Sequence, residues 1–322
     1  MIIANYIKKP SPFVKPLVYL GKIKPSYIGE EMREKIEYAL VKLFLYLAKV
    51  TPKSFMYGFI KGLALLVYQV DKKRRILTIK NLTMAYPEKS IEEVAILSKK
   101  VYVELSKTIT EILLMLVDRF DIDESIVNFE EAKEKLNKLV SSSPKGIVVV
   151  TAHFSNWELA AHFLAKHGLP MLAVGRKGNN TYIDKEITLP FRRKYGNKPT
   201  TKHKAMLAMA KRLKNAQAVG LLIDQKSGDL NSVKVDFFGV PAETTLSVAL
   251  LKSKFDPMIV PIFIARQESG KYKMIINEPL EYESDDKEDE LASMTQEYTT
   301  AVEDIIRQYP SQWFWMHNRW RI

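Results

Sequence analysis

The sequence of 322 residues has room for one enlarged α/β domain or for two domains of about 150 residues each. Apolar residues make up 47% and charged residues 27%, close to the globular average, so a disordered, collagen-like or multi-span membrane chain is excluded. Cysteine is absent, which excludes disulfides, zinc ribbons and cysteine nucleophiles. The net charge of +12 indicates an anionic partner: phospholipid, a phosphorylated substrate, an acidic carrier protein or nucleic acid.

The N-terminal part of the sequence predicts helices that contact a membrane. Residues 1–11 hold only a short apolar stretch broken by lysines and a proline, so no cleavable signal is expected. From Tyr38 to Val70 the sequence is strongly apolar and free of acidic residues, but lysines interrupt it, which favours helices lying in the membrane interface over a spanning helix. Thr51 and Pro52 predict a break between two helices, with Thr51 as the cap of the second. A buried helical pair is the alternative.

Three parts are expected along the chain. Residues 1–75 form the membrane-associating helices, and their basic cluster, Lys72–Arg75, suits anionic lipid headgroups. Residues 76–144 form a helical segment packed on the core, with apolar residues at helical spacing over Ile91–Leu97 and Val101–Val117. Residues 145–322 form the α/β core.

The core alternates between strands and helices. Gly146–Thr151 is rich in β-branched residues, as is typical of a strand buried on both faces of a parallel or mixed sheet. Further strands are expected at Met171–Val174, Val219–Ile223, Met258–Ile264 and Tyr272–Ile276, and helices at about 157–167, 183–194, 203–215, 245–254 and from about 290 to Tyr309. We therefore predict an α/β fold with a mixed, largely parallel central sheet flanked by helices. In such sheets, sites form beyond the carboxyl ends of the strands.

A histidine and a carboxylate follow the first strand of the core. His153 leaves that strand at its carboxyl end, and Asn156 is positioned to cap a helix whose first turn contains Glu158. This placement brings the carboxylate close to the imidazole. A carboxylate bound to one ring nitrogen fixes the tautomer and makes the second nitrogen basic enough to deprotonate a hydroxyl. From these residues alone, a structural histidine and a catalytic one fit equally well.

Several short motifs occur in a fixed order along the chain. They are NL at 81–82 with YP at 86–87, HFSNWE at 153–158, IDQK at 223–226, FFG at 237–239 with Ala242 and Thr244–Thr245, and WFWMHNRW at 313–320. This ordered set resembles the bacterial lipid A biosynthesis acyltransferases, the late lauroyl and myristoyl transferases, within the wider lysophospholipid and glycerolipid acyltransferase superfamily. The resemblance covers nearly the whole chain.

The resemblance implies a membrane-bound enzyme at the cytoplasmic face of the inner membrane. It implies transfer of a fatty acyl chain from acyl carrier protein, or coenzyme A, to a hydroxyl of a glycolipid such as a lipid A precursor. His153 and Glu158 are then the general base and its orienting acid. Because a thioester is already activated, neither a metal nor a redox cofactor is expected.

Four further residues are expected to bind substrate. The resemblance places the downstream arginine of the family at Arg193, although the adjacent Arg192 competes for this position, and its aspartate at Asp224. Asp224 ends a strand as His153 does and is positioned to face the same crevice, but a capping or salt-bridging aspartate is the alternative. For Arg193 the alternative is a basic surface patch. Asn156 and Arg176 are the other candidates; Arg176 begins the RKGNN segment, which matches the family only loosely.

Alternative functions share the same residues. A different phospholipid or glycolipid is a possible acceptor, and a lipid or thioester hydrolase would use the same dyad to activate water. A non-catalytic, membrane-bound binding protein is the third hypothesis. Nucleic acid is not expected as a partner, because no recognition motif accompanies the charge.

Other aromatic and histidine residues have structural explanations. Trp313, Trp315 and Trp320 fit either interface anchoring or core packing, and core packing is expected for at least one. His162 and His167 are five residues apart rather than four, so no metal site is expected there.

Overall fold

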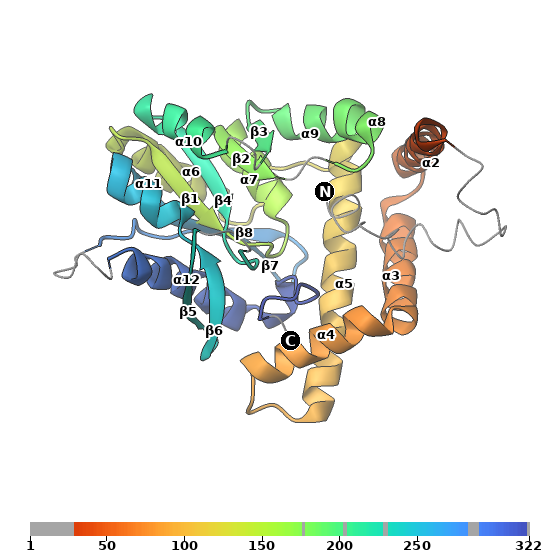
Figure 1. Cartoon of the computed structure of the whole chain (residues 1–322). Coiled ribbons are helices and arrows are strands. Elements are labelled where there is room, and N and C mark those ends of the chain that lie inside the picture. Colours follow the sequence, from red (N-terminus) through yellow and green to blue (C-terminus); the bar gives the residue numbers. More distant parts are fainter. Residues whose placement is uncertain (1–28, 176–177, 202–204, 228–230, 283–289, 321–322) are drawn as a thin grey trace.

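The computed structural model describes residues 29–175, 178–201, 205–227, 231–282 and 290–320. Six strands form a central sheet in the order β3-β2-β4-β1-β7-β8 (Figure 1). They are β1 Ile147–Thr151, β2 Met171–Gly175, β3 Lys198–Thr201, β4 Ala218–Leu222, β7 Met258–Arg266 and β8 Tyr272–Ile276. Every pairing in this sheet is parallel except that of β7 with β8. The predicted α/β fold with a largely parallel sheet is confirmed.

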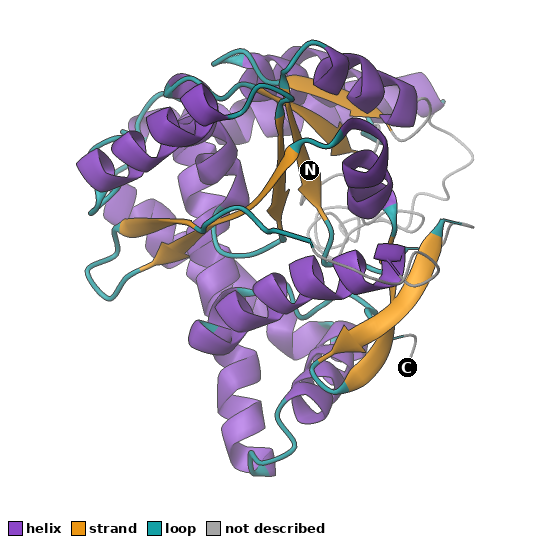
Figure 2. Ribbon diagram, turned by 90° about the vertical axis from the view of Figure 1, so that its left-hand side faces the viewer, coloured by secondary structure: helices purple, strands orange, loops and turns teal. Residues whose placement is uncertain are grey.

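Helices pack on both faces of the sheet, as Figure 2 shows. The longer ones are α2 Glu30–Val50, α3 Lys53–Val70, α4 Lys72–Ala85, α5 Ile91–Leu116, α6 Phe129–Ser142, α7 Trp157–Lys166, α10 Ala205–Lys214, α11 Ser247–Phe255 and α12 Glu290–Gln308. Between β2 and β3 the chain forms α8 Thr181–Ile183, a π-helical turn over Asp184–Thr188, and α9 Leu189–Arg193.

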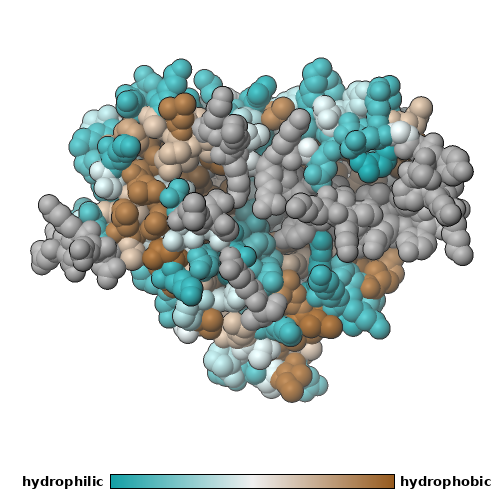
Figure 3. All heavy atoms as spheres, in the orientation of Figure 1, coloured by the Kyte–Doolittle hydropathy of each residue, from teal (hydrophilic) through white to brown (hydrophobic). Residues whose placement is uncertain are grey.

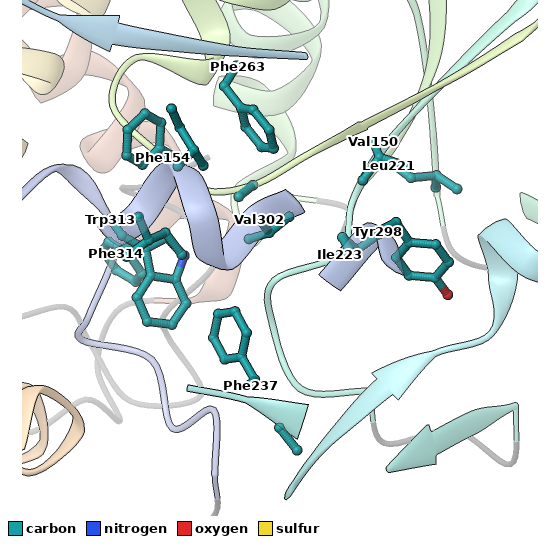
Figure 4. Packing of buried hydrophobic residues seen from close by; sticks show 14 of the residues in the cluster. Val150, Phe154, Leu221, Ile223, Phe237, Phe263, Tyr298, Val302, Trp313 and Phe314 are labelled. Carbon is teal, nitrogen blue, oxygen red and sulfur yellow. The ribbon is translucent and has the colours of Figure 1, made fainter. Parts of the chain in front are cut away.

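Alternate residues of β1 belong to two different hydrophobic clusters. Val148 and Val150 pack in the larger cluster with residues of α4, α5, α10, α11 and α12, whereas Ile147 and Val149 pack with residues of α6 and α7. This alternation follows from the two-residue period of a strand and explains why β1 is apolar throughout. Figure 4 shows Val150, Leu221 and other members of the larger cluster at close range.

The predicted break between the two N-terminal helices is confirmed, with one difference in its capping. The Thr51 hydroxyl donates to the Leu47 carbonyl at 2.7 Å and so closes α2, while Pro52 precedes α3. Both helices pack against α5 through a small apolar cluster of buried residues: Ala48, Met56, Ile60, Ile109 and Leu113.

One face of α2 carries an apolar stripe that the rest of the described protein does not cover. Its members lie three or four residues apart and are between 42% and 58% exposed: Met32, Ile36, Leu40, Leu43, Leu47 and Val50. None of the described helices is both long and apolar enough to cross a membrane.

Three elements differ from the sequence prediction. Residues 91–116 form one helix rather than two, because Ser98, Lys99 and Lys100 continue the helical spacing without a breaker. A separate hairpin, β5 Ser232–Phe237 and β6 Val240–Thr245, was not predicted, nor was β3. The hairpin turns at Phe238 and Gly239, both with positive φ, 60° and 73°, as a two-residue hairpin loop requires. The acidic run from Glu281 to Glu290, for which the sequence predicts a solvated loop, lies mostly outside the described residues.

Candidate active site

Two neighbouring strands bring His153 and Asp224 together. β1 and β4 are adjacent and parallel, and their register pairs Thr151 with Leu222. His153 and Asp224 each lie two residues beyond these paired positions, so both side chains emerge at the same edge of the sheet. His153 Nδ1 and Asp224 Oδ1 are 2.9 Å apart. The crevice beyond the strand ends therefore contains a histidine hydrogen-bonded to a carboxylate.

Asp224 is buried and ionised. Its side chain is 1% exposed, and Oδ2 accepts a hydrogen bond from Trp313 Nε1 at 2.8 Å. Burial alone would raise the pKa of this carboxyl, but the charge and hydrogen bond of His153 and the bond from Trp313 outweigh it and lower the pKa below its usual value. A carboxylate can only accept, so Nδ1 of His153 carries a proton, and in the neutral form of the imidazole Nε2 then presents its lone pair.

His153 is the partly accessible member of the pair. Its side chain is 27% exposed, and the Trp157 ring packs edge-on against the imidazole with centroids 5.2 Å apart. Among the described residues, Nε2 has no hydrogen-bond partner. The ring is therefore fixed on one side and open on the other, which is the geometry that a general base requires.

The C-terminal segment closes one wall of this crevice. Phe314 N–H donates to the His153 carbonyl at 3.1 Å, and Ser155 N–H donates to the Gln312 carbonyl at 2.7 Å. The cavity has a volume of about 10 Å³, close to the least that can hold one water molecule. Its lining comes from α5, from the loop after β1 and from the C-terminal segment: Val101, Glu104, Leu105, Thr108, His153, Ser155, Trp157, Ser311, Gln312, Trp313 and Phe314.

Glu158 lies apart from the imidazole and pairs with Arg192. Arg192 donates from Nη2 to Glu158 Oε1 and from Nε to Oε2, the latter at 3.4 Å, which joins α7 to α9. Burial raises the pKa of Glu158, but the guanidinium outweighs it and the pKa falls to about 2. The sequence interpretation placed this carboxylate beside His153, whereas the structure places Asp224 there. The reason is local: Trp157, the first residue of α7, packs against the imidazole, whereas Glu158 pairs with Arg192 of α9.

Asn156 caps α7 as predicted. Its Oδ1 accepts from the Leu159 N–H at 3.1 Å, and its side-chain NH₂ donates to Glu111 Oε2 at 3.1 Å. Glu111 also accepts from Arg266 and Tyr272, so a buried polar network lies beneath the loop that carries His153. Both ends of the Asn156 amide are thus used within the protein.

Comparison with known proteins identifies the family of this chain. A family model described as bacterial lipid A biosynthesis acyltransferase matches residues 30–322. The chain belongs to this family. The expectation raised by the motifs is confirmed, and the chain is an acyltransferase of lipid A biosynthesis.

Individual relatives of this acyltransferase agree with the family match. A lipid A biosynthesis acyltransferase of Haemophilus influenzae is 27% identical over 256 residues, 79% of each chain. A lipid A biosynthesis lauroyltransferase of Escherichia coli is 28% identical over 282 residues, 86% of this chain and 89% of that protein. A lipid A biosynthesis acyltransferase 2 of Shigella flexneri is 21% identical over 82% of this chain and 83% of that protein.

The two arginines considered for the acyltransferase site separate in the structure. Arg192 is the one that reaches Glu158, whereas Arg193 is exposed on the neighbouring face of α9. Neither Glu158 nor Arg192 lines the cavity beside His153 among the described residues. Arg176 lies outside the described residues.

The remaining motif residues of the acyltransferase support the crevice. Trp313 and Trp315 are fully buried, so the core interpretation of the tryptophans is confirmed for both. Arg319 is buried against Phe237 and donates to the Glu243 carbonyl and to the Thr244 hydroxyl, which ties the C-terminal motif to the hairpin.

Sequence reasoning missed the buried network of Thr108, Glu111 and Arg266. Thr108 and Glu111 lie on the inward face of α5, in positions that helical spacing assigns to apolar residues. A polar pair at core positions was the available signal, because buried charges are retained only with partners.

Proposed function

We propose that this acyltransferase moves a fatty acyl chain from a thioester, carried by acyl carrier protein or coenzyme A, to a hydroxyl of a lipid A precursor, with His153 as the general base. The observation that carries the proposal is the 2.9 Å hydrogen bond between His153 Nδ1 and the buried Asp224 carboxylate, which leaves Nε2 open to the crevice. Family membership supports the reaction class and the lipid A context.

The proposed reaction needs one base and one stabilised oxyanion. Nε2 of His153 takes the proton of the acceptor hydroxyl as its oxygen attacks the thioester carbon, and a tetrahedral oxyanion forms. The oxyanion then collapses, the carbon–sulfur bond breaks, and the imidazolium returns its proton to the thiolate. Asp224 holds the ring in the required tautomer and stabilises its charged form, the part that the sequence assigned to Glu158. Neither step requires a metal or a redox cofactor.

We assign the Glu158–Arg192 ion pair a supporting part in this reaction. The pair joins the first turn of α7, directly after the His153 loop, to α9. Its removal would loosen the helix that begins at the catalytic loop. Arg192, rather than the exposed Arg193, is therefore the arginine to which we assign this supporting part.

We further propose that the chain is held at the cytoplasmic face of the inner membrane by the apolar stripe of α2. Helix α3 also carries exposed apolar residues, Phe55 and Phe59, which stack with ring centroids 6.0 Å apart. In Figure 3, apolar side chains are visible among hydrophilic ones where the end of α3 meets α4. α4 begins with Lys72, Lys73, Arg74 and Arg75, a composition suited to anionic headgroups. Apolar insertion with flanking basic residues is the pattern of an interfacial helix.

Charging the stripe should weaken binding to vesicles. Leu43→Glu with Leu47→Glu should reduce co-sedimentation with vesicles of phosphatidylethanolamine and phosphatidylglycerol at least tenfold, because each change places a charge where a side chain is inserted. The matched control is Leu207→Glu on α10, a leucine that is 71% exposed outside the stripe, which should bind as the wild type does. Full release of the wild type by high salt would contradict apolar insertion, since salt screens charge only.

Lipid mass spectrometry tests the proposed reaction. The wild type, given a long-chain acyl thioester and a lipid A precursor, should add one acyl mass to the precursor. His153→Asn, normalised to folded protein, should add almost none. Free fatty acid without acylated lipid would show a hydrolase instead, and an acyl mass on phospholipid but not on the precursor would exclude the proposed acceptor.

A further inference from the structure

Ser155 has a buried hydroxyl without a hydrogen-bond partner in the wall of the crevice. The residue is 6% exposed, and among the described residues nothing bonds to its Oγ, although it lines the same cavity as His153 and Trp313. An unpaired buried polar group destabilises the folded state, because it loses its hydrogen bonds to water and gains none in the protein. An alanine at this position would have no hydroxyl to leave unpaired, so the serine is not explained by stability.

The backbone of Ser155 is also in an unfavourable conformation. Its φ is 51°, in the left-handed region, where the Cβ of a residue other than glycine comes too close to the following carbonyl oxygen. Two hydrogen bonds hold it there: its N–H donates to the Gln312 carbonyl at 2.7 Å, and its carbonyl accepts from the Thr108 hydroxyl at 3.2 Å. The turn is therefore imposed by its surroundings.

Both of these supports rest on Arg266. Its Nη2 donates to Thr108 Oγ1 at 3.2 Å, and its backbone exchanges two hydrogen bonds with the side-chain amide of Gln312, at 2.9 and 2.8 Å. Arg266 is itself buried and paired with Glu111 and Glu104. A rigid, buried network thus fixes the position of a hydroxyl that bonds to no described residue. Local strain of this kind clusters at functional sites.

We propose that the Ser155 hydroxyl donates a hydrogen bond to the oxyanion formed during acyl transfer. This inference rests on the proposed function above. As the acceptor oxygen attacks the thioester carbon and His153 Nε2 takes its proton, the carbonyl oxygen gains negative charge, which Ser155 Oγ–H stabilises until the carbon–sulfur bond breaks. The Thr108 hydroxyl cannot replace it, because its proton already goes to the Ser155 carbonyl.

The geometry favours a donor over a nucleophile. No hydrogen bond joins Ser155 Oγ to either ring nitrogen of His153: Nδ1 is bonded to Asp224, and Oγ has no partner among the described residues. A serine nucleophile requires a base within hydrogen-bond reach. A hydrogen bond to an oxyanion requires only a fixed donor in a site closed to water.

Ser155→Ala should separate rate from stability. We expect kcat for acyl transfer to fall on the order of 10²-fold with KM nearly unchanged, because the bond is made only in the transition state. We expect the thermal midpoint to stay equal or rise, because the unpaired hydroxyl is removed. Ser106→Ala is the matched control. Ser106, on α5, is buried like Ser155, but its hydroxyl donates to the Val103 carbonyl at 2.6 Å. The Ser106→Ala variant should therefore lose stability and keep its rate per folded molecule.

Other outcomes would overturn the inference. Wild-type kcat in Ser155→Ala would do so, and so would equal losses of rate in Ser155→Ala and Ser106→Ala. If Ser155→Ala fails to fold, Ser155→Gly, which adopts positive φ freely, must still show the rate loss. An added acyl mass on the wild type but not on Ser155→Ala, in the absence of acceptor, would make Ser155 a nucleophile instead. If the wild type releases free fatty acid rather than acylated lipid, the proposed lipid acceptor is wrong. Ser155→Ala should then still slow cleavage of the thioester, because hydrolysis passes through a similar tetrahedral oxyanion.

Discussion

His153→Asn should lower the initial rate of acyl transfer by a factor on the order of 10² to 10⁴ at nearly unchanged thermal stability. Asparagine retains a side-chain N–H close to the position of Nδ1, so Asp224 keeps a donor, but the basic Nε2 is lost. Alanine would be a less informative substitution, because it removes the partner of a carboxylate whose side chain is 1% exposed. The measurement is the initial rate per folded molecule, with folded protein quantified by thermal melting.

The opposite pattern would identify a structural histidine. His162 provides the comparison: it is buried, and its two ring nitrogens lie 2.7 and 2.9 Å from the Glu158 and Phe191 carbonyls. His162→Asn should lower the melting temperature more than the rate per folded molecule. If His153→Asn behaves in that way, the catalytic assignment is wrong.

Glu158→Gln should lower the free energy of unfolding by about 3–5 kcal/mol, because it removes the carboxylate charge that binds the Arg192 guanidinium in a largely buried position. Chemical denaturation at pH 7 measures this loss. Glu131→Gln is the control: its pair with Lys135 is exposed on α6, so the midpoint should hardly move. An equally small effect of Glu158→Gln would show that the Arg192 pair contributes little.

The stability difference between wild type and Glu158→Gln should depend on pH in a defined direction. The pKa of Glu158 is about 2 in the folded protein and 4.5 as the ordinary value. A lowered folded-state pKa contributes stability that is complete above pH 4.5 and lost as pH falls toward 2. Denaturation should therefore show the same difference in unfolding free energy between the two proteins at pH 7 and pH 5. At pH 4 and pH 3 this difference should become smaller. A difference that widens on acidification would contradict the ion pair.

The order of strands and helices could be predicted because the buried strands are continuous apolar runs. β1, β2, β4, β7 and β8 all lie within two residues of their predicted ends. The β5–β6 hairpin escaped prediction for a physical reason: its strands contain Lys234, Asp236 and Glu243, and Phe238 occupies a turn position with positive φ that usually favours asparagine or glycine. Its stability comes from packing on α12 and from Arg319, which lies far away in the sequence.

The site was predicted in part. The sequence located His153 at a strand end and placed Asp224 at another, and the structure brings them into contact. The partner of His153 could not be deduced, because the sequence does not state that β1 and β4 are neighbours. Asp224 ends a strand as His153 does, but Glu158 is much closer to His153 in the sequence, only five residues away. The choice between Arg192 and Arg193 depended on which face α9 turns toward α7, and that orientation is a property of tertiary packing.

The most direct test of the account is a double-mutant cycle on His153→Asn and Asp224→Asn, with initial acyl-transfer rate per folded molecule as the readout. If Asp224 acts through the imidazole, each single change should cost a large part of the rate, and the double variant should be hardly slower than His153→Asn. Glu158→Gln serves as a third arm and should slow the remaining reaction by its own, smaller factor. Losses of His153→Asn and Asp224→Asn that simply multiply in the double variant would contradict the account, because they would show that the two residues act independently.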